Sequence, residues 1–134
     1  MKKKIRWIIP MILLGGIPFT LLYTSKGSNP SKQLYQANCA SCHMDQGEGL
    51  KKLIPPLAEA DYLAQTEKLA CIIRNGMEGE VIVNGVSYNQ PMPSNETLSE
   101  IEITNLINYI RNEWGNKHPY LSPQEVKKHL EECD

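Results

Sequence analysis

The sequence predicts a mostly α-helical fold in which three core helices, joined by loops and a small β-hairpin, follow an N-terminal hydrophobic segment. Two observations indicate the helices: apolar residues recur at helical spacing, and helix-capping residues stand where these runs begin. The dipeptide Asn84-Gly85 inside the alternating segment 81–88 indicates the hairpin. A chain of 134 residues with one apolar stretch therefore holds one small domain plus a targeting or anchoring segment.

The first two core helices are predicted from periodicity and from their ends. The first is expected to run through Leu34 and Tyr35 into Cys39, which lies at its C-terminal end. The second is expected to begin at Thr66, whose hydroxyl can cap it, and to end at Gly76.

The third core helix is predicted from a capping box and a long apolar stripe. Ser99 is followed three residues later by Glu102, and the helix is expected to stop at Gly115. Its apolar stripe consists of Ile103, Leu106, Ile107, Ile110 and Trp114. This stripe is expected to face the core.

The sequence Cys39-Ala40-Ser41-Cys42-His43 is the most informative motif in the chain. C-x-x-C-H is the spacing at which two thiols bond the vinyl carbons of a haem, while the following imidazole reaches the iron. A redox dithiol or half of a zinc site are the alternatives. No second C-x-x-C or H-x-x-x-H completes a zinc site, and no βαβ pattern surrounds the cysteines. The motif therefore predicts one covalently attached haem c.

Composition restricts the function. Fifteen acidic and nine basic residues follow Ser28, which gives that part of the chain a net charge of −6. This excess argues against nucleic acid as a partner; it either favours a partner with a basic docking face or serves only solubility. No catalytic triad, pair of carboxylates or phosphate loop is recognisable, so the sequence favours an electron-transfer protein over an enzyme.

The N-terminus predicts export. Three lysines and Arg6 precede the apolar run 7–23, a pattern that leaves the basic end in the cytoplasm and places the domain on the periplasmic side of the membrane. Residues 1–24 are interpreted as a signal peptide or a membrane anchor, with the retained anchor favoured because no A-x-A cleavage site follows. Residues 25–30 are expected to form a linker.

The C-terminal part leaves two questions open. Residues 117–134 are expected to form a helical tail, because Ser122 and Glu125 make a second capping box; this tail packs on the domain or lies in solvent. Cys71 and Cys133 lie outside the C-x-x-C-H motif. They pair with each other, or Cys71 is simply buried, or Cys133 bridges two chains.

The ordered set of motifs over residues 31–116 resembles the class I cytochrome c family. Tyr35 lies four residues before Cys39, where the family has an aromatic side chain that packs on the terminal helix, and Tyr109 and Leu106 resemble its partners. The resemblance implies that the carbonyl of Pro55, or of the adjacent Pro56, accepts a hydrogen bond from the haem-ligating histidine, which fixes the orientation of the imidazole.

The resemblance also implies the distal ligand. Gln90-Pro91-Met92-Pro93 resembles the loop in which the family carries its methionine ligand, so His43 and Met92 are expected to bind the iron. Met77 remains an alternative. Ligation by two histidines would need His118 or His129, which follow the matched region.

The segment 55–63 looks most like bacterial respiratory cytochromes, including those associated with nitrite reductases and quinoprotein dehydrogenases. This resemblance implies a one-electron carrier that takes electrons from a quinol-oxidising complex or a dehydrogenase and passes them to a terminal oxidase or reductase. A fixed cytochrome subunit of a membrane oxidoreductase is the alternative. Haem-based ligand binding or peroxidase chemistry would require Met92 to leave the iron. Tyr88 and Trp114 either donate hydrogen bonds to a haem propionate or belong to the core.

Overall fold

The computed structural model describes residues 29–133. The expected signal peptide or anchor over 1–24, and the part of the expected linker before residue 29, lie outside the described residues. No helix among the described residues is long and apolar enough to cross a membrane. The elements are α1 (Pro30–Asn38), α2 (Ala40–His43), the 3-10 helix η1 (Asp61–Ala64), α3 (Thr66–Asn75), β1 (Val81–Val83), β2 (Val86–Tyr88), α4 (Glu100–Ile110) and α5 (Pro123–Glu131).

Helix α1 begins at Pro30, within the range expected for the linker. The side chain of Asn29 caps it by accepting a hydrogen bond from the backbone N–H of Ser31 at 3.0 Å. The helix ends at Asn38, and Cys39 is its C-terminal cap, as expected. Cys39 has a φ of −125°, outside the helical region, so that α2 forms a separate turn. This break lets the motif turn away from the axis of α1.

Helix α3 ends as expected but begins differently. Thr66 is its first helical residue, and the preceding Gln65 caps it without a side-chain hydrogen bond, so the expected capping role of Thr66 is wrong. The Thr66 hydroxyl donates instead to the carbonyl of Ala64 at 3.3 Å. At the other end Gly76 terminates α3 with a φ of 79° and a ψ of −171°, a conformation that is essentially restricted to glycine.

The expected hairpin is confirmed. Strands β1 and β2 pair antiparallel, and Asn84 and Gly85 both have positive φ values, as a tight two-residue turn requires. The turn is fastened to η1 by a reciprocal pair of hydrogen bonds. The N–H of Asn84 donates to the Asp61 carboxylate at 2.8 Å, and the N–H of Asp61 donates to the Asn84 side chain at 3.0 Å. The hairpin is therefore held beside η1.

Helix α4 has the expected capping box of Ser99 and Glu102, but it ends at Ile110 instead of Gly115. The carbonyl of Ile110 accepts a hydrogen bond from the side chain of Asn116 at 2.7 Å, which satisfies one of the free carbonyls at the helix end. Trp114 lies beyond the helix with a φ of 51°, so its ring is not part of the helical stripe.

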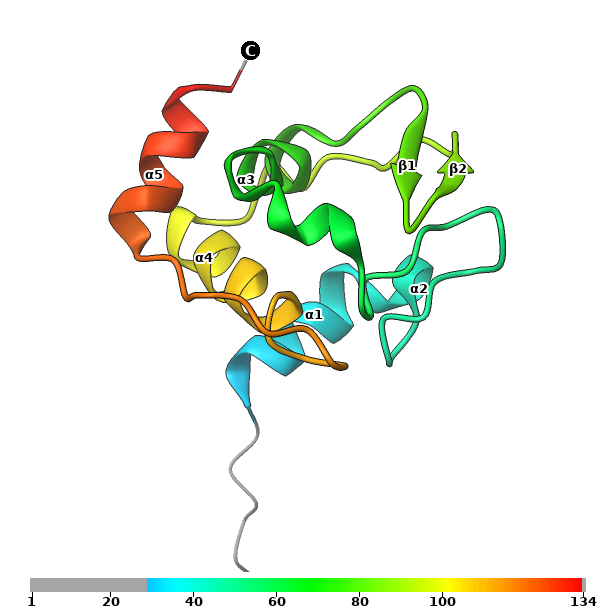
Figure 1. Ribbon diagram of the computed structural model, residues 1–134. Coiled ribbons are helices and arrows are strands. Elements are labelled where there is room, and N and C mark those ends of the chain that lie inside the picture. Colours follow the sequence, from blue (N-terminus) through cyan, green and yellow to red (C-terminus); the bar gives the residue numbers. More distant parts are fainter. Residues whose placement is uncertain (1–28, 134) are drawn as a thin grey trace, which may run out of the picture.

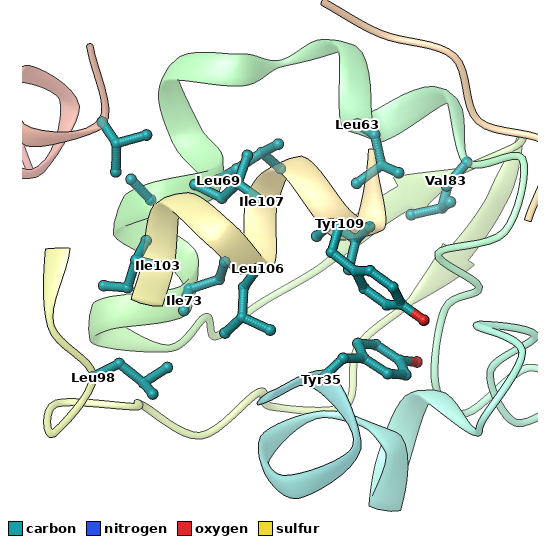
Figure 2. Close-up of a cluster of buried hydrophobic side chains, with 14 of the residues drawn as sticks. Tyr35, Leu63, Leu69, Ile73, Val83, Leu98, Ile103, Leu106, Ile107 and Tyr109 are labelled. Atoms are coloured by element: carbon teal, nitrogen blue, oxygen red, sulfur yellow. The ribbon is translucent and has the colours of Figure 1, made fainter. Parts of the chain in front are cut away.

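The core is organised around α4, which packs against α1, α3 and α5. In Figure 1, α5 lies at the side of the molecule opposite to the hairpin. Figure 2 shows the apolar side chains of α4 in the middle of the cluster, with two tyrosine rings side by side at one end. The largest fully buried side chains are Tyr35, Ile103, Leu106, Ile107 and Val126.

Helix α5 packs on the domain and is covalently attached to it. Ser122 and Glu125 form the expected capping box, and Val126 is fully buried between α5 and its neighbours. Cys71 of α3 and Cys133, just beyond α5, form a disulfide. Of the alternatives that the sequence left open for these cysteines, the structure therefore shows the intrachain pair.

The segment that leads to α5 is anchored to α4. The side chain of Asn108 donates to the carbonyl of Leu121 and accepts from its N–H, both at 2.8 Å. The buried side chain of Arg111 donates to the carbonyl of Pro119 at 2.9 Å. These three bonds fix the path of the tail across α4.

Candidate functional site

An apolar cleft opens between the C-x-x-C-H motif, α3, the hairpin and the loop around residue 92. Its empty space, together with the solvent space at its open mouth, is about 1090 Å³. None of the described residues that line it carries a formal charge at neutral pH apart from any charge on His43. The lining consists of Cys39, Cys42, His43, Ile54, Pro55, Pro56, Leu57, Ala60, Tyr62, Leu63, Leu69, Ile72, Ile73, Met77, Gly79, Val81, Val83, Gln90, Pro91, Met92, Pro93, Leu106 and Ile110.

The two cysteines of the motif enter the cleft as free thiols. Cys39 is partly buried and Cys42 is exposed, and they are not bonded to each other. Burial, together with the nearby Cys42, raises the pKa of the Cys39 thiol to about 11. Cys39 therefore lacks the lowered pKa that is typical of the reactive cysteine in a thioredoxin-like site.

His43 is oriented by one hydrogen bond. Its Nδ1 lies 3.0 Å from the carbonyl oxygen of Pro55, and a carbonyl can only accept, so Nδ1 carries the proton. Burial lowers the pKa of His43, and the bond to Pro55 opposes that shift only in part. The neutral imidazole therefore keeps the lone pair of Nε2 free to bind a metal. Of the two adjacent prolines, Pro55 supplies the carbonyl.

Gly49 allows the Pro55 carbonyl to reach this position. Gly49 has a φ of 67°, and a Cβ atom there would lie 2.7 Å from the Pro55 carbonyl oxygen and 2.5 Å from that of Ile54. A side chain at this position would push the loop away from His43. No local sequence pattern indicates this role of Gly49, because the contact depends on the path of the loop over 50–54.

Met92 reaches the cleft from a loop that is bonded to the end of α3. The N–H of Met77 donates to the carbonyl of Met92 at 2.9 Å, and the N–H of Met92 donates to the carbonyl of Met77 at 2.8 Å. Both methionines line the cleft. Met92 therefore lines the same cleft as His43, and Met77, the alternative ligand, lies directly beside it.

The other candidates lie elsewhere. Neither His118 nor His129 lines the cleft, and His129 borders a second hollow between α3 and α5. Tyr88 and Trp114 do not line the cleft either, so their reading as core residues agrees with the structure. Met44 follows His43 but contributes no surface to the cleft.

An aromatic cluster of Tyr35, Tyr109 and Trp114 packs beside the C-x-x-C-H motif. The ring of Tyr35 lies 5.6 Å from that of Tyr109 and 4.9 Å from that of Trp114, measured between centroids. The Tyr35 hydroxyl donates to the carbonyl of Met44 at 2.6 Å. Tyr109 was expected as a partner of Tyr35, whereas Trp114 was expected on the helical stripe. The left-handed conformation of Trp114 turns its ring into this cluster and against Gly47.

The residues of the cleft fit a covalently attached haem. An apolar wall suits the porphyrin, two unpaired thiols suit its vinyl groups, and an imidazole with one nitrogen already engaged suits the iron. Such a combination defines a c-type haem site of the kind that transfers electrons.

Comparisons with known proteins agree. The chain belongs to the cytochrome c family, whose model matches residues 28–114. Its cofactor is therefore one covalently attached haem c with its iron.

The chain is similar in sequence to two kinds of protein. Over 133 residues the chain is 32% identical to cytochrome c-552 of Thermus thermophilus, a match that covers 92% of this chain and 84% of that protein. Over 95 residues it is 33% identical to the cytochrome c subunit of a quinone alcohol dehydrogenase from Gluconacetobacter polyoxogenes. This second match covers 69% of this chain but only 20% of the subunit.

Proposed function

We propose that this protein is a one-electron carrier that shuttles electrons between respiratory complexes outside the cytoplasmic membrane. Its haem is attached through Cys39 and Cys42, and His43 and Met92 are the axial ligands. One observation carries the proposal: His43, oriented by its bond to Pro55, and Met92, held by its backbone bridge, line the same apolar cleft.

The bound haem supplies one-electron redox chemistry. The carbonyl of Pro55 holds the proton on Nδ1 of His43, which makes Nε2 the ligating atom and raises its basicity. The thioether of Met92 is a soft ligand that favours reduced iron and therefore raises the potential. Two protein ligands leave no open position for a substrate, which suits electron transfer and disfavours catalysis.

Two features support a location outside the cytoplasmic membrane. Covalent haem attachment needs cysteines that have not paired with each other, and Cys71 and Cys133 form a disulfide, which is typical of an oxidising compartment. The basic start and apolar run before residue 24 suit a domain tethered to the outer face of the membrane. The partners of such a carrier are a quinol-oxidising complex or dehydrogenase as donor, and a terminal oxidase or reductase as acceptor.

A fixed subunit of a membrane oxidoreductase is the second candidate. It is favoured by the similarity to the cytochrome c subunit of a quinone alcohol dehydrogenase. The match to that subunit covers 20% of its length, whereas the match to cytochrome c-552 covers 84% of that protein. This difference in coverage favours the free carrier. A free carrier should purify alone and exchange electrons with several partners, whereas a fixed subunit should co-purify with one enzyme in detergent.

The first experiment is the absorption spectrum of the matured protein, oxidised and reduced. His/Met ligation predicts the weak far-red band of a thioether bound to ferric iron, together with slow or absent carbon monoxide binding after reduction. Absence of the band with rapid carbon monoxide binding would show an open iron, and the protein would then be a ligand-binding haem protein.

A further inference from the structure

We propose that Met77 is a reserve axial ligand, whose thioether takes the distal position on the haem iron when Met92 is displaced or removed. The inference rests on the proposed function, because it requires a haem that His43 already binds on the opposite side. It assigns a role to a second methionine that the proposed ligand set leaves unused.

The backbone places the two methionines as direct partners. Met77 and Met92 exchange both of their backbone hydrogen bonds, at 2.9 and 2.8 Å. Side chains of directly opposed residues in an antiparallel pair emerge on the same face, with Cβ atoms about 4.5–5.5 Å apart. Both residues line the cleft, and they are the two thioethers among the described residues that do so. The two sulfur atoms therefore start from neighbouring points on one wall.

This pairing does not depend on the side chain of Met92. The backbone N–H of Asn95 donates to the carbonyl of Ile73 in α3 at 3.0 Å, which gives the loop a second attachment. Gly76 packs against the carbonyl of Met92 without a side chain between them. Because these contacts are made by backbone atoms, truncating Met92 leaves Met77 opposite the same position.

Met77 lies between two hollows. It borders the haem cleft and also the second hollow, which is lined by Cys71 and His129 as well. Its unbranched side chain has three rotatable bonds and adapts to irregular spaces. The thioether can therefore rest towards the hollow while Met92 is bound and turn into the cleft when that position opens.

The exchange is a substitution of one neutral thioether for another. The bond between iron and the sulfur of Met92 breaks, the bond to the sulfur of Met77 forms, and no proton or electron is transferred. Ligand softness is unchanged, so the protein remains an electron carrier instead of exposing an open iron to small ligands. Met77 would thus suppress the haem-based ligand binding that loss of Met92 otherwise permits.

The test compares three holoproteins by ferric absorption and by carbon monoxide binding after reduction. We expect Met92→Ala to keep a thioether band and Met77→Leu/Met92→Ala to lose it. Met44→Leu/Met92→Ala is the matched control, because Met44 lies outside the cleft, and it should keep the band. Carbon monoxide should bind Met77→Leu/Met92→Ala at least about tenfold more tightly than Met92→Ala. In Met92→Ala the Met77 thioether competes for the iron and lowers the fraction of iron that is open.

Loss of the band in Met92→Ala, with carbon monoxide binding as tight as in the Met77→Leu double variant, would overturn the proposal. Met92→Leu, which fills more of the vacated space, provides a second background if Met92→Ala folds poorly. If neither Met92→Ala nor Met92→Leu retained a folded haem domain, that result would also count against a reserve ligand. Absence of the band in the unmodified protein is a different result, which would overturn the proposed function itself.

Discussion

Gly76 and Met92 are in direct backbone contact at the end of α3. A Cβ atom at residue 76 would overlap the carbonyl oxygen of Met92 and lie 2.9 Å from the N–H nitrogen of Ser94. The left-handed φ of 79° independently favours glycine. The helix end and the methionine loop are therefore packed as one unit.

This contact predicts a specific effect of Gly76→Ala. We expect the free energy of unfolding to fall by about 1–3 kcal/mol because of the strained backbone, and the thioether band to weaken because the loop is pushed away. Gly85→Ala is the control: its φ is 74°, but no atom lies within 4 Å of the added Cβ. It should lose stability and keep the band. Equal loss of the band in both variants would refute the role of the contact.

Gly49→Ala should act on the opposite side of the haem. The added Cβ displaces the Pro55 carbonyl, which weakens its hydrogen bond to Nδ1 of His43. A less basic imidazole stabilises ferric iron less, so we expect a higher midpoint potential with the thioether band retained. Redox titration measures this shift against Gly85→Ala. An unchanged or lowered potential would contradict the assigned role of Pro55.

The Cys71–Cys133 disulfide should contribute substantially to stability. It closes a loop with a sequence separation of 62, and cross-links of this kind typically contribute about 2–4 kcal/mol. Urea unfolding of Cys71→Ser/Cys133→Ser should show a loss of this size, while the absorption spectrum at low urea remains that of the native haem. Reduction of the unmodified protein with a dithiol should have the same effect. Equal midpoints with and without the disulfide would disprove the prediction.

Tyr35 should make stability sensitive to alkaline pH. Its hydroxyl donates to the carbonyl of Met44 at 2.6 Å, and burial raises its pKa well above the ordinary value of 10.0. Only the neutral phenol can donate, so its contribution is complete below pH 10.0 and is lost as the pH rises through the higher pKa of the folded protein. Tyr35→Phe should cost about 0.5–1.5 kcal/mol at neutral pH.

Unfolding of Tyr35→Phe and of the unmodified protein should be compared at neutral and alkaline pH. The difference between them is expected to shrink above pH 10.0. Tyr120→Phe is the control, since Tyr120 is 72% exposed and should change stability little at any pH. A difference that stays constant or grows with pH would contradict the expected titration of Tyr35.

The features that the sequence predicted well are local. The C-x-x-C-H motif, both capping boxes, the Asn84-Gly85 turn and the end of α3 at Gly76 each depend on residues within a few positions of one another. Local backbone preferences and short-range hydrogen bonds determine such features. The apolar stripe of α4 also predicted four of the buried core residues, Ile103, Leu106, Ile107 and Ile110, because burial follows the period of the helix.

Where local signals competed with distant contacts, the sequence was less informative. Helix α4 ends at Ile110 because the Asn116 side chain takes its carbonyl and that of Leu57, fifty-nine residues from Asn116 in the chain. The missed packing of Trp114 on Tyr35 has the same origin. The Thr66 side chain could cap a helix. However, η1 ends two residues before Thr66, and the Thr66 hydroxyl donates to the carbonyl of Ala64 at the end of η1 instead.

The sequence by itself determined the haem attachment motif, the helical class of the fold and the two methionines that could be ligands. Only the tertiary structure decided that Pro55 orients His43, that Cys71 pairs with Cys133, and that Met77 lies opposite Met92. Each of these relationships joins segments that are separate along the chain. Their geometry is set when the helices pack around α4, and no local pattern of residues encodes it.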